Sequence, residues 1–291
     1  MPSETAASGL DVRGEVYQDD DHAVSGGASA RMQIAKPTTT CSRKLAMTTN
    51  YDPIAEQYKR SKQQPWRTFI ECFTLMEVIG DPRGMAVLDV ACGEGFYTRM
   101  LRQRGAARVT GVDLSQGMIH LARCQEAQHE LGIEYVVGDA RELSSTNAYD
   151  LIVAAYLLNY ARNRDELQVM CDGIARSLKP GGRFVTVNSS PSLNFAATPS
   201  YRQYGFETTV VGDWREGAPI KWTFYLSDGP FDIENYYLDF EIHDAAFRKA
   251  GFEQIRCHEP KLSPEGLRAN NREFWSTFLD HSPVAFIECV K

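Results

Sequence analysis

The 291-residue chain lacks the features that mark several large classes of protein. Its longest uninterrupted apolar run is the eight residues from Leu151 to Leu158, far short of the ~20 residues that cross a membrane. Positive charge is also scarce, with 31 Lys and Arg against 38 Asp and Glu, and no basic cluster marks a nucleic-acid site. The sequence therefore predicts a soluble protein that binds neither membranes nor nucleic acids.

Paired spacings typical of metal sites and disulfides are missing as well. The seven cysteines are scattered and odd in number, and no two of them form a CxxC pair. The six histidines show neither HxxxH nor HxH spacing, so no metal site is predicted. Scattered thiols of this kind are typical of a reducing compartment, and we expect a cytoplasmic protein.

The first 46 residues differ in composition from the rest of the chain. Residues 1–46 are rich in Ser, Thr, Ala and Gly and carry the acidic run Asp19–Asp21. Because they show no hydrophobic periodicity and no signal-peptide pattern, we expect a disordered leader, with Met47 as an alternative start. Residues 47–84 have helical spacing and are expected to form an N-terminal helical segment. Residues 85–291 are the expected main domain.

Strand and helix patterns alternate from residue 85 onward. Seven segments have the apolar character of strands, at 85–91, 108–114, 133–139, 149–156, 183–189, 252–259 and 283–290. Helical spacing lies between them, at about 95–104, 115–130, 163–178 and 240–250. This order predicts an α/β fold with a Rossmann-like, mostly parallel seven-stranded sheet.

The alternation is interrupted by residues 190–237, which read as short strands rich in aromatic side chains. The interruption follows the fifth expected strand. It should therefore lie above the carboxyl ends of the sheet, where open α/β sheets bind ligands. We interpret it as an inserted β-rich substrate cap.

An acidic side chain closes three of the expected strands. Asp89 precedes the turn Gly93-Glu94-Gly95, which is not a dinucleotide fingerprint because Thr98 occupies the third glycine position of GxGxxG. A carboxylate there would repel a pyrophosphate and attract an ammonium. Asp113 can accept hydrogen bonds from ribose hydroxyls, and Asp139 can meet an adenine amino group. These acids describe a ligand with an ammonium, a ribose and an adenine but no phosphate, and S-adenosylmethionine fits.

Five stretches in this order resemble the class I S-adenosylmethionine-dependent methyltransferases: "VLDVACGEGFYT", "VTGVDLSQGMIHLAR", "YVVGDARE", "YDLIVAAYLLNY" and "LKPGGRFVTVN". The resemblance implies an antiparallel last strand and an N-terminal helical lid over the cofactor. It also implies a set of cofactor-binding residues, namely Tyr58, Asp89, Ala91, Gly93, Gly95, Asp113, Leu114, Met118, Asp139, Ala140, Ala154 and Tyr156.

Two further stretches, "YDPIAEQYKRSKQQPWR" and "SPEGLRANNREFW", resemble the toxoflavin synthase group, which methylates a nitrogen of an azapteridine-like ring. The resemblance implies methyl transfer to a nitrogen, or an oxygen, of a small aromatic heterocycle. Candidate substrate-binding residues are aromatic side chains that could stack on a flat ring, namely Tyr97, Trp214, Trp222, Tyr225 and Tyr236. Each of them has core packing as its alternative.

Catalytic residues are less clearly marked. Tyr58 and His243 are the candidates, with a core aromatic and a structural histidine as the alternatives. His258, Glu234 and Asp213 are further candidates for a general base. Methyl transfer needs mainly alignment of the acceptor and exclusion of water, so no catalytic dyad is required.

The sequence leaves alternatives for the roles of a few residues and for the function of the whole chain. Arg60 or Lys62 could meet the cofactor carboxylate instead of being solvated, and Cys92 is a small loop residue rather than a nucleophile. A non-catalytic module that binds S-adenosylmethionine or dimerises through the cap is the alternative to an enzyme. Methylation of another small-molecule class or of a protein is a further alternative, and the oligomeric state is either a monomer or a homodimer.

Overall fold

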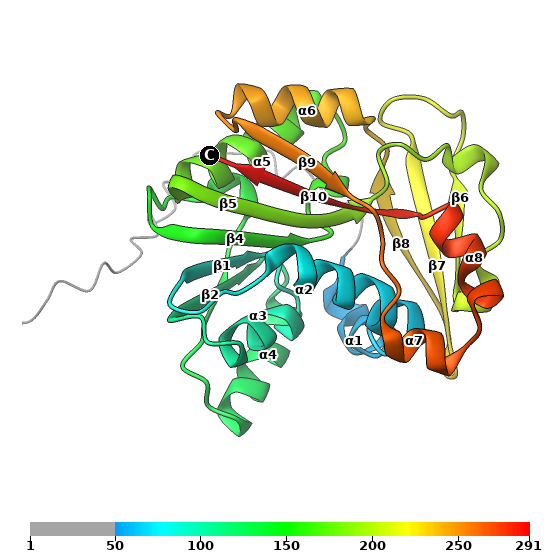
Figure 1. The fold of residues 1–291 in the computed structure, drawn as a ribbon, viewed down its shortest axis with the longest axis horizontal. Helices are drawn as coiled ribbons and strands as arrows, with labels where there is room; N and C mark the ends of the chain where they lie inside the picture. Colours follow the sequence, from blue (N-terminus) through cyan, green and yellow to red (C-terminus); the bar gives the residue numbers. More distant parts are fainter. Residues whose placement is uncertain (1–49) are drawn as a thin grey trace, which may run out of the picture. The chain divides into compact units, whose positions relative to one another are not determined.

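The computed structural model describes residues 50–291 (Figure 1). The expected leader, residues 1–46, lies outside the described residues. Seven strands form one sheet in the order β3-β2-β1-β4-β5-β10-β9. Their bounds are β1 Ala86–Val90, β2 Arg108–Asp113, β3 Glu134–Val137, β4 Tyr149–Ala155, β5 Leu178–Ser189, β9 Gln254–His258 and β10 Val284–Val290.

The pairing of these strands confirms the predicted topology. β1 pairs in parallel with both β2 and β4, and β3 and β5 extend the parallel sheet on either side. β10 lies between β5 and β9 and runs antiparallel to both. The chain therefore has a Rossmann-like sheet with an antiparallel last strand, and all the parallel strands end at one edge.

Helices cover both faces of the sheet (Figure 1). Their bounds are α1 Ala55–Ser61, α2 Phe73–Ile79, α3 Phe96–Gln103, α4 Gln116–Gln128, α5 Arg164–Ser177 and α6 Phe240–Lys249. Successive strand residues point to opposite faces, so Val87 packs in one hydrophobic cluster with α2, α3 and α4 while Leu88 packs in a second cluster with α5 and α6. None of the helices in residues 50–291 is long and apolar enough to span a membrane.

A second, three-stranded antiparallel sheet lies between β5 and α6 in the sequence. It consists of β6 Phe206–Val210, β7 Pro219–Leu226 and β8 Gly229–Tyr236. Side chains of β7 alternate, so Trp222 and Phe224 are buried while their neighbours Lys221 and Thr223 are only half-buried. Trp66, on the N-terminal helical segment, and Phe206 pack at a ring-centroid distance of 5.0 Å. The small sheet thus shares its core with the N-terminal helices.

Three helical features differ from the sequence expectation. The N-terminal helical segment begins its second helix with a π-helical turn, Arg67–Cys72, before α2. Two short helices, α7 Pro264–Ala269 and α8 Arg272–Asp280, were not predicted. Each begins at a side-chain cap, from Ser263 and Asn271, which accept hydrogen bonds from backbone amides. These caps were signals in the sequence, but the two segments have only six and nine residues.

Candidate functional site

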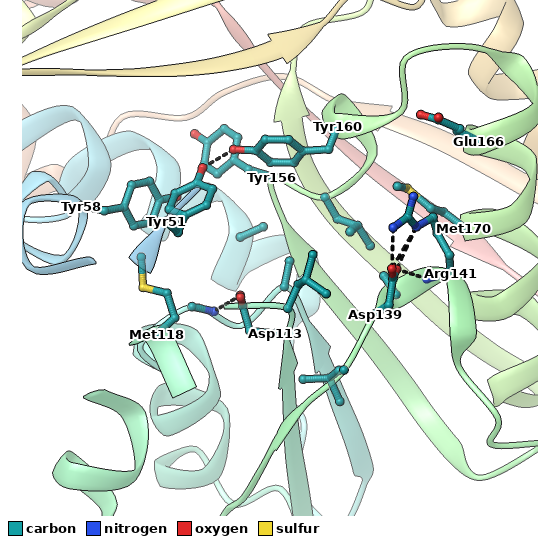
Figure 2. A pocket seen from close by; sticks show the side chains of 18 of the residues that line it. Tyr51, Tyr58, Asp113, Met118, Asp139, Arg141, Tyr156, Tyr160, Glu166 and Met170 are labelled. Atoms are coloured by element: carbon teal, nitrogen blue, oxygen red, sulfur yellow. Dashed lines mark hydrogen bonds and ion pairs between the residues drawn. The ribbon is translucent and has the colours of Figure 1, made fainter. Parts of the chain in front are cut away.

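A large cavity opens at the carboxyl ends of β1, β2 and β4 (Figure 2). It encloses about 970 Å³ of empty space, part of it open to solvent. Ten of the residues proposed from the sequence line it, namely Tyr58, Ala91, Gly93, Asp113, Leu114, Met118, Asp139, Ala140, Tyr156 and Tyr236. We call this space the large cavity.

The loop after β1 forms one wall of the large cavity. Ala91, Gly93 and Gly95 all have left-handed backbone conformations, with φ of 59°, 58° and 84°. Gly95 begins α3 and is tightly packed, because an added Cβ would lie 2.3 Å from the Tyr135 hydroxyl. Ala91 adopts the same backbone region at a cost that glycine would avoid.

Asp113 stands at the tip of β2 with its carboxylate held by the backbone. The amide of Gly93 donates to Oδ2 at 2.8 Å, and the amide of Ser115 donates to Oδ1 at 2.9 Å. Burial raises the pKa of Asp113 above its ordinary value, while these two hydrogen bonds act in the opposite direction. Each carboxylate oxygen can accept a further hydrogen bond, so Asp113 is equipped to bind a pair of ligand hydroxyls.

Asp89 lies beneath the same loop and does not line the large cavity. Its side chain is 1% exposed, and the hydroxyl of Thr98 donates to Oδ2 at 2.6 Å. Oδ1 has no hydrogen-bond partner among the described residues. Burial raises the pKa of Asp89 to about 7. A carboxylate with one buried, unpartnered oxygen is suited to a cationic ligand group that approaches through the loop.

Asp139, the third predicted acid, is already occupied by a neighbour. The Arg141 guanidinium binds both of its oxygens, with Nε to Oδ1 at 2.9 Å and Nε to Oδ2 at 3.1 Å. Burial raises its pKa, but the hydrogen bonds and charge of Arg141 outweigh burial and lower it overall. Asp139 and Arg141 both line the large cavity, so a ligand there meets an ion pair rather than a free carboxylate (Figure 2).

The N-terminal segment closes over the large cavity. Tyr51 and Tyr160 line it and are joined by a hydrogen bond between their hydroxyls (Figure 2). Asp52, next in the chain, accepts from the amide of Gly117 at 2.9 Å and from the hydroxyl of Ser115, and so caps α4. The segment is therefore attached to two separate elements beside the cavity.

Lys62 brings a cation to the same wall. Its ammonium lies 5.1–5.6 Å from the ring centres of Tyr58, Phe96 and Tyr97, and it forms no ion pair with any described residue. Arg60, the other cation weighed for this role, is exposed and pairs with Asp228. Of these two cations, Lys62 is thus the one that lines the large cavity.

A buried hydrogen-bond network centres on Glu71. Its carboxylate accepts from Nη1 of Arg67 at 3.0 Å, from the hydroxyl of Tyr97 at 2.6 Å and from the hydroxyl of Tyr156. Arg67 is 3% and Glu71 is 1% exposed. Burial raises the pKa of both tyrosines well above the ordinary value, so both phenols remain protonated donors. Tyr156 itself has a left-handed backbone, with φ of 63°.

A second, narrow space of about 10 Å³, room for roughly one water molecule, lies beside the large cavity. We call it the small cavity. Its walls come from the N-terminal helical segment, the end of β4 and the inner face of the small sheet, with the residues Tyr58, Trp66, Arg67, Tyr156, Trp222, Phe224, Ile233 and Asn235. Tyr58 and Tyr156 line both cavities, so the two spaces adjoin at these side chains.

The remaining sequence-predicted residues lie elsewhere. Ala154 is fully buried in β4 and lines neither cavity, and Tyr97 contacts the site through Glu71 and Lys62. Trp214 packs against Tyr237 with ring centres 4.2 Å apart, and Tyr225 lies under the guanidinium of Arg202, so neither lines a cavity.

His243, the candidate base, is 5% exposed on α6, and its Nδ1 hydrogen-bonds the carbonyl of Asp239 at 2.8 Å. It lines neither cavity, and burial lowers its pKa. The other candidates, His258, Glu234 and Asp213, do not line the cavities either. In residues 50–291, no group of three or more His, Cys, Asp or Glu side chains is placed to hold a metal ion.

Several lining residues were not anticipated from the sequence: Tyr51, Arg67, Arg141, Leu157, Tyr160, Arg162, Glu166 and Met170. Tyr160 follows the end of β4 within the quoted "AAYLLNY", so its position near a strand end was a usable signal. Glu166 and Met170 come from α5 and carry no local motif. Arg67 and its partner Glu71 share the i,i+4 spacing of many exposed helix pairs, which hides their burial.

The sequence of this chain is similar to those of known methyltransferases. A protein-family profile described as a methyltransferase domain matches residues 87–182. A demethylmenaquinone methyltransferase of Tropheryma whipplei is 37% identical over 202 residues, which is 65% of this chain and 79% of that protein. A ubiquinone/menaquinone biosynthesis C-methyltransferase of Desulfotalea psychrophila is 28% identical over 76% of this chain and 85% of its own length.

The fold is shared with a solved structure. A crystal structure of an S-adenosylmethionine-dependent methyltransferase from Mesorhizobium loti superposes with a TM-score of 0.56 at 19% sequence identity. It covers 79% of this chain and 100% of that one. At this identity the likeness concerns the fold.

Proposed function

This chain belongs to the class I S-adenosylmethionine-dependent methyltransferases, and on that premise we propose that it methylates a nitrogen, or an oxygen, of a small aromatic heterocycle. The methyl donor is S-adenosylmethionine. The observation that carries the proposal is the set of aromatic side chains that line the large cavity, namely Tyr51, Tyr58, Tyr156, Tyr160 and Tyr236. The sequence resemblance to enzymes that methylate azapteridine-like rings points to the same class of acceptor.

The residues of the large cavity fit the donor. Asp113 would hold the ribose hydroxyls, because its carboxylate is fixed by two backbone amides and retains free acceptor capacity. Oδ1 of Asp89 would accept from the ammonium, which supplies the partner that this buried oxygen lacks. Lys62 would pair with the carboxylate, and Met118 and Leu114 would pack on the adenine. Asp139 would contribute through its ion pair with Arg141.

The acceptor would occupy the side of the large cavity that is lined by tyrosines. Tyr58 and Tyr156, together with Tyr236 of the small sheet, supply faces on which a flat ring would stack. The small sheet would then act as the substrate cap, the role expected of residues 190–237.

In this reaction the chain mainly has to position the acceptor atom against the methyl group. S-adenosylmethionine, when bound, supplies an electrophilic methyl on a sulfonium. Tyr58 and Tyr156 line both cavities and would align the acceptor atom with that methyl. The closed N-terminal segment would exclude water. No residue is required to remove a proton in the site, which fits the position of His243 away from both cavities.

The test is a substrate screen. Purified chain is incubated with S-adenosylmethionine and a panel of one- and two-ring heterocycles, phenols and quinols, and products are read by mass spectrometry for a gain of about 14 daltons. We expect methylated heterocycles whose yield falls when Tyr58 is replaced by alanine. No methylated product from any member, despite tight S-adenosylhomocysteine binding, would favour the non-catalytic module instead.

A second candidate is C-methylation of a hydroxylated or quinol ring. It is favoured by the similarity to two quinone-pathway methyltransferases, of which one is named as a C-methyltransferase. The same screen separates the two, because a methyl on carbon survives conditions that cleave N- or O-methyl groups. We further propose a cytoplasmic protein, since the six cysteines of the described residues are free thiols. A homodimer stays a proposal for sedimentation analysis.

A further inference from the structure

Tyr135, on β3, is a buried tyrosine beside the loop that follows β1. Its side chain is 4% exposed, and it lines neither the large nor the small cavity. In the parallel sheet, Asp89 of β1 lies opposite Gly111 of β2, and Gly111 lies opposite Tyr135 of β3. Residues in register on parallel strands point to the same face of the sheet. Tyr135 and Asp89 therefore share one face of the sheet, and only a glycine lies between them.

The ring of Tyr135 occupies the space that two glycines leave open. A Cβ added to Gly111 would lie 2.8 Å from Cδ1 and 3.0 Å from Cε1 of the tyrosine. A Cβ added to Gly95 would lie 2.8 Å from both Cε1 and Cζ and 2.3 Å from the hydroxyl oxygen. Contacts of a Cβ below 3.0 Å are essentially never seen in proteins, so a larger residue at either position would displace the ring. The ring thus crosses β2 over Gly111 and ends against Gly95, the residue that begins α3.

The backbone of Tyr135 is held in place from two sides. It pairs with β2, and the Arg123 guanidinium of α4 donates to its carbonyl, with Nη2 at 2.6 Å and Nε at 3.2 Å. At the other end of the contact, Gly95 belongs to the loop whose Gly93 amide donates to Asp113 at 2.8 Å. The ring therefore connects a fixed part of the sheet to the loop that faces the large cavity.

This loop benefits from support because its sequence does not fix its shape. Ala91, Gly93 and Gly95 are all left-handed, and glycine populates many other backbone conformations as readily. A loop that becomes ordered only when a ligand binds subtracts the cost of ordering from the affinity, whereas a loop already held in its binding conformation avoids that cost. A rigid ring behind Gly95 restricts the loop before the donor arrives.

We propose that Tyr135 is a positioning residue for S-adenosylmethionine: its ring holds the loop of residues 91–95 in the conformation that receives the donor, without lining the cavity itself. It acts through Gly95, and Gly111 has no side chain because the ring passes over it. The proposal concerns binding of the donor and needs no acceptor. It can therefore fail while the proposed acceptor class stands, and the reverse.

The first experiment removes the ring and measures S-adenosylhomocysteine binding to the full chain by calorimetry. Tyr135→Val should lower the affinity about tenfold, because the loop loses its support. Tyr135→Phe keeps the ring atoms that meet both glycines and removes no hydrogen bond, since the Tyr135 hydroxyl has no partner among the described residues. It should bind within about twofold of the unchanged protein.

Tyr149→Val is the matched control for loss of a buried tyrosine. Tyr149 begins β4, is 2% exposed and lines neither cavity. Its replacement should lower the stability in chemical denaturation, as Tyr135→Val does, and leave the affinity for S-adenosylhomocysteine unchanged. The comparison separates a loss of packing from a loss of loop support.

The second experiment presses on the ring instead of removing it. Gly111 is not among the left-handed residues of the described chain, so Gly111→Ala adds no backbone strain there. The new Cβ would crowd Tyr135 and also Cys92, whose Sγ would lie 2.9 Å away. Gly111→Ala should weaken S-adenosylhomocysteine binding about threefold or more in the presence of the ring, and less in the Tyr135→Val background.

Several results would overturn the role of Tyr135. It falls if Tyr135→Val keeps the affinity of the unchanged protein, if Tyr149→Val weakens binding as strongly, or if Tyr135→Phe loses as much as Tyr135→Val. It also falls if Gly111→Ala weakens binding equally with and without the ring. Should Tyr135→Val fail to fold, Tyr135→Phe and Gly111→Ala decide alone: the proposal requires near-normal binding in the first and weakened binding in the second.

Discussion

The large and the small cavity are adjacent, yet they are built in different ways. The large cavity is made mainly by the turns that follow β1, β2 and β4, which the parallel sheet brings to one edge. The small cavity joins the N-terminal helical segment, the end of β4 and the inner face of the small sheet, so its walls span residues 58–235. One space follows from the order of strands, and the other depends on how distant elements pack together.

This difference has a functional meaning. Positions fixed by strand order can be kept while the sequences around them change, which suits a donor shared by a whole family. Walls contributed by a separate sheet can change without disturbing the central one, which suits an acceptor that differs between enzymes. The predictions below test whether the two cavities can be disturbed independently, beginning with the largest expected effect.

Replacing Asp113 by alanine should damage the large cavity alone. The variant loses a carboxylate expected to bind two ribose hydroxyls, so the affinity for S-adenosylhomocysteine should fall at least about 100-fold in calorimetry. Asp150→Ala is the matched control, because Asp150 also accepts from a backbone amide, that of Ala86 at 2.8 Å, and does not line either cavity. Unchanged affinity in Asp113→Ala would refute the ribose assignment.

Tyr156→Phe should disturb both cavities, because Tyr156 lines each of them. Removing its hydroxyl leaves one oxygen of Glu71 with fewer donors and should lower the free energy of unfolding by about 1–3 kcal/mol. Methyl transfer should slow as well. Tyr97→Phe removes an equivalent hydrogen bond to Glu71 without touching a cavity, so it should cost similar stability and leave the KM for the acceptor unchanged. Equal kinetic losses in both variants would reduce Tyr156 to a structural role.

The pH dependence of donor binding should report on Asp89. Because burial raises the pKa of Asp89 to about 7, the free protein should lose stability as pH rises from about 4 to 7 and the unpartnered carboxylate forms. An ammonium supplies that partner, so the affinity for S-adenosylhomocysteine should rise as pH increases through about 7, by up to about tenfold between pH 6 and pH 8. In Asp89→Asn, this pH dependence of the affinity for S-adenosylhomocysteine should vanish. A pH profile identical in both proteins would remove Asp89 from the ammonium site.

Ala91→Gly should have the smallest effect. Ala91 has φ of 59°, and glycine relieves that conformation but adds freedom to the unfolded chain. We expect the free energy of unfolding to rise by up to about 1 kcal/mol in chemical denaturation. Asn147→Gly, at φ of 46°, is the control, and it should gain less because asparagine tolerates this region. A clear loss of stability in Ala91→Gly would show that the Ala91 methyl is needed for packing.

The sequence predicted the parts that follow from local pattern. The alternation of strands and helices led to the seven-stranded sheet, and the acids at the strand tips led to Asp113 and its neighbours. It could not show that Arg141 occupies Asp139, because that pairing depends on the turn geometry of Ala140–Glu142. It also treated Trp222, Trp214 and Tyr225 alike. Only the pairing of the small sheet and its packing on the N-terminal helices separates Trp222, on a cavity wall, from the other two.

Tyr51 and Asp52 bear on the timing of turnover. These adjacent residues fasten one short segment to two elements, Tyr51 to Tyr160 and Asp52 to the start of α4. S-adenosylhomocysteine that leaves past this segment would need both contacts to break at the same time. Tyr51 and Asp52 are adjacent in the chain and cannot move far apart. In many enzymes a slow opening of this kind, rather than bond making, sets the pace of the cycle. We therefore expect release of the spent donor past this doubly tied segment, rather than methyl transfer, to limit the rate of turnover.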